Sequence, residues 1–281
     1  MLKTEISNGN EIALITCEAT GGYEKKLVDF MFSNQFPIHV ANPLKIRRFA
    51  ESKGLFAKTD KIDAQVIAEY SETMKPEADS KLKTAEESSL AEKIKRRDQL
   101  IGDKVREGLR LDKELSPGTK QSIKSHIKWL EKEIGKIEEA IKNIQKNELI
   151  NKKLELLTSV PSIGKVTALT LIAYLPELGK YNKKKLAALV GLAPFARESG
   201  KYKGRRFIRA GRSILRKALY MAALSAVRHY KEMKELYLRL RIKGKAAKLA
   251  LIAVARKLLH VANSVMQRQS VWNETYSSVT I

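Results

Sequence analysis

Aliphatic residues recur at alternating spacings of four and three between positions 123 and 144 of the chain. They are Ile123, Ile127, Leu130, Ile134, Ile137, Ile141 and Ile144. A seam of this period buries one narrow face of a helix against a second helix. Pro117 and Gly118 separate this stretch from an earlier and looser one, whose apolar residues are Leu90, Ile94, Ile101, Val105 and Leu109. We predict a coiled-coil helical hairpin over residues 81–152, which either closes within one chain or dimerises.

Residues 1–80, which precede the hairpin, alternate between short apolar runs and amphipathic stretches. Residues 11–17 are typical of a buried strand, and Glu18 stands at its end, followed by a turn with two glycines. A second short strand is expected at 37–41, and helices are expected after each strand and near Asp60. This alternation predicts a parallel α/β layer.

Residues 153–269, which follow the hairpin, have an all-helical pattern that ends in two long apolar helices. Residues 160–164 form a turn that resembles a helix-hairpin-helix, whose second helix would offer backbone N–H groups to a DNA phosphate. A plain connection between two helices is the alternative, and Ser162 stands where that motif often has glycine. We expect the tail, residues 270–281, to be poorly ordered.

The chain carries 54 Lys and Arg against 31 Asp and Glu, and this excess indicates a polyanionic partner. Nucleic acid is the first expectation, and a ribosome-like role or an anionic membrane is the alternative. One cysteine, Cys17, excludes a disulfide framework. The sequence shows no uninterrupted apolar run of about 18 residues and no signal peptide, so we expect a cytoplasmic protein without a membrane partner, on the nucleoid when DNA-bound.

Asp60 and Asp63 lie three residues apart at the start of a predicted helix, so both carboxylates would share one face. Acidic residues in a first helical turn are also ordinary partners of the helix dipole. Glu18 adds a third carboxylate at the C-terminal end of a strand, where ligand sites of α/β sheets form. Three acids would repel one another unless a cation lay between them. Two Mg²⁺ ions held there would clamp a phosphodiester and activate the attacking oxygen.

Ser199 lies in an expected loop, residues 194–200, within the densest group of basic residues in the chain. The predicted nucleic-acid contacts in this group are Arg197, Lys201, Lys203, Arg205, Arg206, Arg209, Arg212 and Arg216. A serine before a glycine is more often a turn or cap residue, but arginines could hold a scissile phosphate and stabilise its transition-state charge. The four histidines are scattered and offer no general base, so a metal site would have to activate Ser199.

These motifs together resemble the DEDD transposases of insertion sequences, which are recombinases guided by a bridge RNA and related to the Piv DNA invertases. The resemblance rests on residues 17–23, 42–43, 58–64, 160–164, 189–194, 199–200, 211–219, 244–245 and 255–258. It implies a RuvC-like domain of RNase H-like fold, an intervening coiled coil and a helical transposase domain. It also implies that Glu18, Asp60 and Asp63 are the second to fourth acids of a metal-binding tetrad, and that Ser199 is the nucleophile that becomes joined to DNA. The family's two halves meet across protomers, which implies a homo-oligomer, a dimer or tetramer, bound to guide RNA and two DNA sites.

The first acid of the tetrad has no counterpart in this sequence. The family carries it on an opening strand some tens of residues before the glutamate, whereas the residues before Glu18 contain only Glu5 and Glu11 as acids. We therefore expect a RuvC-like domain that lacks its first strands, an N-terminal truncation from a degenerate element or a misplaced start codon, and weak or absent catalysis. The alternatives to a recombinase are a nucleic-acid-binding remnant without chemistry and a RuvC-like nuclease that uses water.

Overall fold

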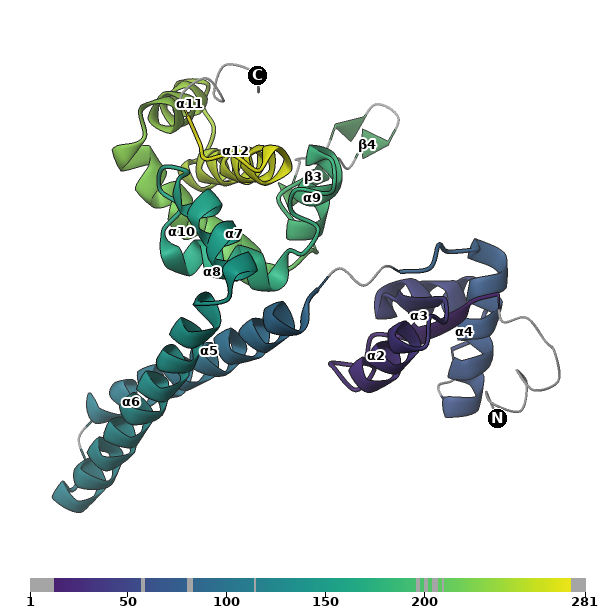
Figure 1. Ribbon diagram of the computed structural model, residues 1–281, viewed down its shortest axis with the longest axis horizontal. Helices are drawn as coiled ribbons and strands as arrows, with labels where there is room; N and C mark the ends of the chain where they lie inside the picture. The colour runs from purple at the N-terminus through teal and green to yellow at the C-terminus, as the bar shows by residue number, and fades with distance from the viewer. Residues whose placement is uncertain are drawn as a thin grey trace. The chain divides into compact units, whose positions relative to one another are not determined.

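The computed structural model of the chain contains two units, residues 1–81 and residues 82–281. It describes residues 13–56, 59–79, 83–113, 115–195, 198–199, 202–203, 207–208 and 210–273. The described fold is mostly helical, with small two-stranded sheets (Figure 1). The smaller unit holds the predicted α/β layer, and the larger unit holds the hairpin and the remaining helices.

The smaller unit has the strand-helix-strand-helix order that the sequence predicts. Its elements are β1 (Ile15–Glu18), α2 (Lys25–Ser33), β2 (Ile38–Ala41), α3 (Pro43–Ser52) and α4 (Asp60–Met74). The two strands run parallel, with Ile15 opposite Ile38 and Glu18 opposite Ala41. The parallel α/β expectation is therefore confirmed for the described residues, whereas the RuvC-like assignment stays a prediction.

Side-chain caps set where two helices of the smaller unit begin. Asn42 Oδ1 accepts a hydrogen bond from the Leu44 amide at 2.9 Å at the start of α3. Thr59 Oγ1 accepts one from the Ile62 amide at 3.3 Å, and α4 therefore begins at Asp60. These helices and β2 enclose a small apolar core, whose buried residues are Ala41, Ile46, Ala50, Val66 and Tyr70.

Two long helices of the larger unit, α5 (Ala85–Leu111) and α6 (Pro117–Gln145), form the predicted hairpin (Figure 1). Thr84 and Glu87 cap α5 reciprocally, because each side chain bonds the other residue's backbone N–H. Every residue of the seam predicted on α6 is buried or half-buried. The seam on this arm is therefore confirmed.

The seam predicted on the first arm is wrong beyond its first turns. Leu90 and Ile94 are buried, but Ile101, Val105 and Leu109 are 40%, 56% and 62% exposed. After position 94 the buried face continues at positions 97, 100 and 107. The steps from 94 to 97 and from 97 to 100 are both three residues long, whereas a heptad seam alternates steps of three and four. The buried face therefore rotates around α5, away from Ile101, Val105 and Leu109. The three exposed residues form an apolar row on α5, which we call the hairpin stripe.

A polar pair occupies the hairpin interface beside this change of face. Glu107 is 7% exposed, and its Oε1 lies 3.0 Å from Nδ1 of His126 on α6 and accepts a hydrogen bond from Arg110 at 2.7 Å. A buried carboxylate must be paired in this way, because an unpaired one would be costly to desolvate. The pairing gives α5 a polar seam position that apolar periodicity could not predict.

Six described helices complete the larger unit around one core. They are α7 (Glu148–Thr158), α8 (Lys165–Tyr174), α9 (Lys183–Val190), α10 (Ser213–His229), α11 (Lys231–Ile242) and α12 (Ala247–Arg268). Leu90, Ile94 and Ile141 of the hairpin belong to the same core, so the base of the hairpin is continuous with the bundle. The expected apolar helices correspond to α10 and α12, and α11 between them was not predicted.

Among the described residues, α12 is the one helix long and apolar enough to cross a membrane. It is not an uninterrupted apolar run, which is what the sequence was expected to lack, because Arg256, Lys257 and His260 lie within it. Within the larger unit, 61% of its apolar window is buried. This degree of burial is typical of a helix in the core of a folded domain.

The turn between α7 and α8 contains a strained residue, since Ser162 has a φ of +71°. L-residues other than Asn and Asp rarely adopt this left-handed conformation, which suits glycine. Beyond α12, the Trp272 amide donates a hydrogen bond to Ser159 Oγ at 2.8 Å, and its ring meets that of Tyr230 edge-on. The start of the expected tail is therefore anchored, and residues 274–281 lie outside the described residues.

Residues 192–210, which we call the serine insert, contain strands where a loop was expected. The strands are β3 (Pro194–Phe195), β4 (Glu198–Ser199), β5 (Tyr202–Lys203) and β6 (Phe207–Ile208). β3 pairs with β6 and β4 with β5, both antiparallel. The described residues of the insert therefore form two short antiparallel strand pairs, and β4 stands off from the helices of the larger unit in Figure 1.

Candidate active site

Two of the three predicted metal-binding carboxylates line one cavity of the smaller unit. Glu18 is the last residue of β1, and Asp63 lies in the first turn of α4. Both line a cavity of about 370 Å³, together with Arg47 of α3 and Phe56. Asp60 is one helical turn from Asp63 and is not among the lining residues. The structure thus brings Glu18 and Asp63, but not Asp60, to a common space.

The position of α4 against β1 is fixed by polar contacts as well as by the apolar core. Thr16 Oγ1 of β1 and Ser71 Oγ of α4 form a hydrogen bond of 2.7 Å. This bond ties the strand that carries Glu18 to the helix that carries Asp63. Because both acids are held by ordered elements, the distance between them is set by the fold rather than by a loop.

The carboxylates fit a divalent cation only in part. Among the described residues, no group of three or more His, Cys, Asp or Glu side chains gathers closely enough to hold a metal ion. Oxygen ligands of this type nevertheless suit hard cations such as Mg²⁺, which binds proteins through one or two carboxylates and keeps several waters. Glu18 and Asp63 supply two such carboxylates. Asp60 and Asp63 also remain suitable partners for the dipole of α4.

Glu24 is a residue of this region that the sequence analysis missed. Its Oε2 accepts hydrogen bonds from the backbone N–H groups of Thr20 and Gly22, at 3.0 and 2.9 Å. Burial is the largest single influence and raises its pKa, but the hydrogen bonds to the carboxylate together outweigh burial and hold the pKa below the ordinary value. Glu24 therefore closes the glycine turn directly after Glu18. A glutamate two residues after a Gly-Gly pair was the available signal.

The neighbouring thiol is not a nucleophile candidate. Cys17 is half-buried in β1, and burial, followed by the charges of Glu24 and Asp79, raises its pKa. A thiol with a raised pKa holds its proton at neutral pH and reacts slowly. The candidate nucleophile of the chain is therefore the serine of the larger unit.

Ser199 is in β4, where its backbone pairs with Tyr202 of β5. Lys203, another predicted phosphate contact, pairs with Glu198 in the same two-stranded sheet. The remaining predicted contacts of the serine insert fall outside the described residues, and they are Arg197, Lys201, Arg205, Arg206 and Arg209. The larger unit thus holds the serine, and the smaller unit holds the carboxylates.

Two glycines meet where the serine insert joins the helices. Gly191 and Gly211 both have positive φ, at +78° and +74°. A Cβ atom added to Gly191 would lie 2.3 Å from the Ala210 carbonyl oxygen, and one added to Gly211 would lie 2.3 Å from the Gly191 nitrogen. The two ends of the insert therefore approach as closely as backbones allow, and only glycine fits at either position.

Arg212 and Arg216, the last two predicted phosphate contacts, bond to the protein at this junction. Arg212 donates two hydrogen bonds of 2.6 Å to the Glu177 carboxylate and one of 2.9 Å to the Tyr174 carbonyl. Arg216 donates one of 2.7 Å to the Ala210 carbonyl. Both guanidinium groups thus hold the base of the insert, and whether they also touch phosphate stays a prediction.

Glu177, the partner of Arg212, is the second residue that the sequence analysis missed. It is 5% exposed. Burial raises its pKa, but the hydrogen bonds and charge of Arg212 outweigh burial and hold the pKa below its ordinary value. No local motif marks this residue, because its partner is 35 positions away.

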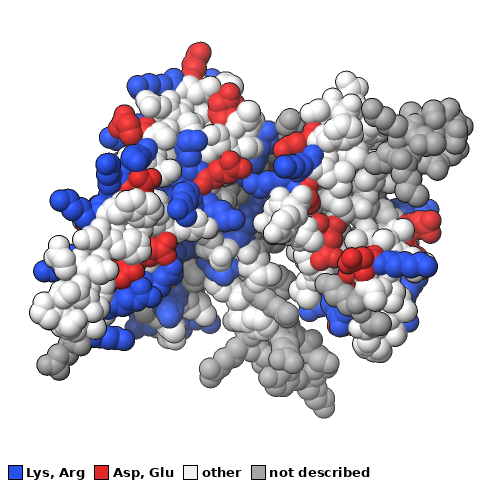
Figure 2. All heavy atoms as spheres, turned by 90° about the horizontal axis from the view of Figure 1, so that it is seen from below, with Lys and Arg blue, Asp and Glu red and all other residues white. Residues whose placement is uncertain are grey.

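Positive charge extends well beyond the serine insert. On the face drawn in Figure 2, Lys and Arg side chains are spread widely, with Asp and Glu scattered among them. The first turn of α9 carries three consecutive lysines at positions 183–185, although cations oppose the helix dipole there. A surface of this kind attracts polyanions along its length rather than at one point.

Comparison with known proteins agrees with this distribution of groups. Residues 154–238 match the "Transposase IS116/IS110/IS902 family", and residues 1–117 match the DEDD transposase family of IS110 type. The chain is 30% identical to the pilin gene-inverting protein of Moraxella lacunata over 261 residues, which cover 89% of this chain and 79% of that protein. It is 25% identical to the transposase for insertion sequence element IS1111A of Coxiella burnetii over 303 residues, which cover 95% and 80%. The chain belongs to the IS110 family of DEDD transposases.

Proposed function

We propose that this recombinase cuts and rejoins DNA through Ser199, with Mg²⁺ held by the carboxylates of the smaller unit. The observation that carries the proposal is that Glu18 and Asp63, from separate elements, line one cavity. The DEDD transposases typically use a divalent metal ion. Glu18 and Asp63, with Asp60 one turn away on α4, would hold one or two ions. Bound Mg²⁺ would supply a Lewis acid for the phosphate.

The proposed cleavage exchanges one phosphate ester for another. The Ser199 oxygen forms a bond to phosphorus while the bond between phosphorus and one flanking sugar oxygen breaks. The serine proton passes to solvent or to a carboxylate, and the sugar oxygen takes up a proton and leaves as a hydroxyl. Attack by the hydroxyl of a second strand reverses the step, frees the serine and joins new partners. The number of ester bonds is unchanged, so no external energy source is needed.

The basic residues of the serine insert would hold the DNA phosphate. Arginine binds phosphate through paired N–H groups and stabilises charge that develops during transfer. The related pilin gene-inverting protein and IS1111A transposase are named for rearranging DNA, so DNA is the proposed substrate. We further propose a guide RNA as second partner, as the resemblance to transposases guided by a bridge RNA implies, and the net charge of +23 is compatible with it. The proposed setting is the cytoplasm.

The proposed active unit is a homo-oligomer, a dimer or tetramer. The hairpin stripe leaves Ile101, Val105 and Leu109 on one side of α5, where a second hairpin could cover them. Because serine and carboxylates lie in different units of the chain, an oligomer could combine the serine of one protomer with the carboxylates of another. Dimerisation through the hairpin would bring two serines and two sets of carboxylates into one assembly.

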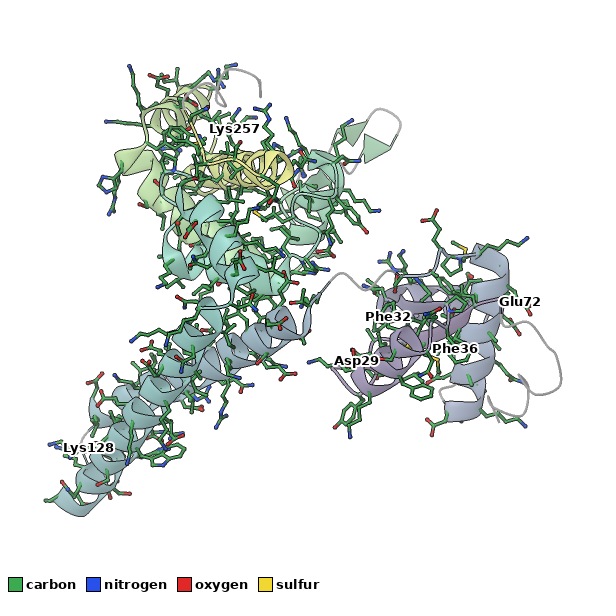
Figure 3. The ribbon with its side chains drawn as sticks, viewed as in Figure 1. Asp29, Phe32, Phe36, Glu72, Lys128 and Lys257 are labelled. Atoms are coloured by element: carbon green, nitrogen blue, oxygen red, sulfur yellow. The ribbon has the colours of Figure 1, made fainter. Side chains whose placement is uncertain are left out.

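Recombination between donor and target DNA, with guide RNA, Mg²⁺ and purified protein, tests the proposal. We expect Ser199→Ala and Asp63→Asn to abolish recombination. The matched controls are Ser125→Ala on α6 and Glu72→Gln on α4, both exposed. Figure 3 labels Glu72 on the same helix as Asp63. Recombination by Ser199→Ala at the unmutated rate would rule out the serine as nucleophile.

Nucleic-acid binding without chemistry is a second candidate function. It is favoured by the finding that no group of three metal-ligating side chains gathers among the described residues. It predicts binding that weakens steeply with salt, because each phosphate contact releases counterions. It also predicts that Glu18→Ala leaves every measurable activity unchanged. Loss of recombination in Glu18→Ala would exclude it.

A further inference from the structure

Two phenylalanines face each other across the strands of the serine insert. Phe195 of β3 and Phe207 of β6 are register partners in an antiparallel pair. Partners that lie directly opposite project from the same face of a ladder, with Cβ atoms about 4.5–5.5 Å apart. Both side chains are nearly half exposed, at 45% and 44%. The insert therefore presents an aromatic surface to solvent.

The sequence around this surface is basic. Between positions 192 and 210 the chain has one acid, Glu198, and its basic residues are Arg197, Lys201, Lys203, Arg205, Arg206 and Arg209. Aromatic side chains set among cations are the arrangement that binds single-stranded nucleic acid, since bases stack on the rings while cations meet the phosphates. The basic composition of the insert favours a polyanion over an apolar protein partner.

The surface is held in place at both ends of the insert. The close approach of Gly191 and Gly211 fixes the junction, and Arg216 bonds the Ala210 carbonyl just after β6. Phe195 and Phe207 belong to the strand pair nearer this junction. Ser199 belongs to the pair beyond it. A base stacked on the phenylalanines would therefore lie on the strand pair whose chain leads directly into the pair that carries the serine.

We propose that Phe195 and Phe207 form a stacking platform for an unpaired nucleobase next to the phosphate that Ser199 attacks. The placement next to the attacked phosphate rests on the proposed function of Ser199, whereas the stacking itself does not. The ligand is an unstacked base of single-stranded or locally opened DNA, or of RNA. Stacking tolerates every base, because each has a π-face. The platform would thus hold an opened strand without reading its sequence.

Fluorescence of an adenine analogue placed in a single-stranded DNA oligonucleotide tests the platform with the full-length protein. Binding should quench the fluorophore, because it stacks on the rings. We expect Phe195→Ala and Phe207→Ala to lose the quenching and to bind the single strand about 5- to 100-fold more weakly. The salt dependence of binding should not change, because the phosphate contacts remain. Phe207→Trp should keep the quenching, and Phe30→Ala, an exposed phenylalanine of α2, is the control.

Three further measurements assign the ligand. The same oligonucleotide as RNA separates the two sources of an unpaired base, and equal effects in both would support a platform for either strand. A fully paired duplex should bind all variants equally, and equal losses for duplex and single strand would overturn the inference. Vesicles of anionic phospholipid test a membrane instead, and vesicle binding that depends on Phe207 while oligonucleotide binding does not would also overturn it.

Ser199→Ala keeps the two proposals apart. If stacking is correct, this variant still quenches the fluorophore, whether or not it recombines. Lost recombination with retained quenching supports both proposals. If Ser199→Ala recombines normally and Phe207→Ala still loses quenching, the proposal that Ser199 is the nucleophile is rejected and the stacking proposal is retained. If quenching is unchanged in both phenylalanine variants, only the stacking proposal is rejected.

Discussion

The ion pair between Arg212 and Glu177 gives the sharpest test of how the serine insert is held. The two residues differ in the exposure of their side chains alone, which is 7% for Glu177 and 37% for Arg212. Removal of either partner should therefore have unequal effects. Arg212→Ala leaves a buried carboxylate without its main partner, whereas Glu177→Ala leaves a guanidinium that reaches water and still bonds the Tyr174 carbonyl.

The magnitudes follow from these exposures. Breaking a buried pair by removing one partner costs about 3–5 kcal/mol. Lys83, which also lowers the pKa of Glu177, should keep Arg212→Ala near the lower limit. Glu177→Ala should cost about 1–2 kcal/mol, because the remaining charge is partly solvated. Arg212→Lys should fall between them, since lysine cannot form the two parallel bonds.

Urea denaturation followed by tryptophan fluorescence measures these costs. The two tryptophans, Trp129 and Trp272, both lie in the larger unit, so the signal reports the unit that holds the pair. Arg228→Ala, an exposed arginine of α10, is the control and should change stability by less than about 0.5 kcal/mol. An equal or smaller cost for Arg212→Ala than for Glu177→Ala would refute this reasoning.

Four further predictions concern strain, close contacts, charge and assembly. Ser162→Gly should stabilise the larger unit by about 0.5–1 kcal/mol in urea denaturation, because glycine adopts the positive φ without strain. A destabilised variant would show that the serine side chain contributes more than its strain. Gly191→Ala should lower stability far more than Gly244→Ala, since both have positive φ but only Gly191 faces backbone at 2.3 Å, and equal losses would contradict the close contact. Burial, followed by nearby cations, lowers the pKa of His260 to about 4. The unfolded chain therefore binds the proton more readily, and stability should fall as pH drops from about 6.5 toward 4. This fall should disappear in His260→Gln, and a pH profile shared by both proteins would contradict it. Val105→Lys should shift light-scattering mass from oligomer toward monomer if the hairpin stripe mediates assembly, and an unchanged mass would exclude that role.

Much of the smaller unit and of the hairpin follows from local sequence patterns. The apolar runs that become β1 and β2, the cap at Asn42 and the α6 seam each depend on residues close together in the chain, so their signals survive in a single sequence. The positions of Glu18 at the end of a strand and of Asp63 in the first turn of a helix follow for the same reason, whereas their role as metal ligands stays a prediction. Each sits at a strand end or helix start that its own neighbours define.

The features that could not be predicted depend on contacts between distant residues or on very short elements. The strands of the serine insert are two residues long, which is too short for an alternating pattern. The first-arm seam failed because Glu107, a polar residue, takes an interface position by pairing with His126. Arg212 was expected to meet phosphate, and its bond to Glu177 is visible only once α10 is packed against the end of α8.

Trapping of a covalent protein–DNA adduct tests the central claim most directly. Full-length protein would be incubated with guide RNA, Mg²⁺ and a nicked DNA substrate that cannot be rejoined, and the adduct would be mapped by mass spectrometry. The account predicts a phosphate ester on Ser199 that forms with Mg²⁺ and is absent from Asp63→Asn. Cleavage without any adduct, or an adduct on a residue other than Ser199, would contradict it.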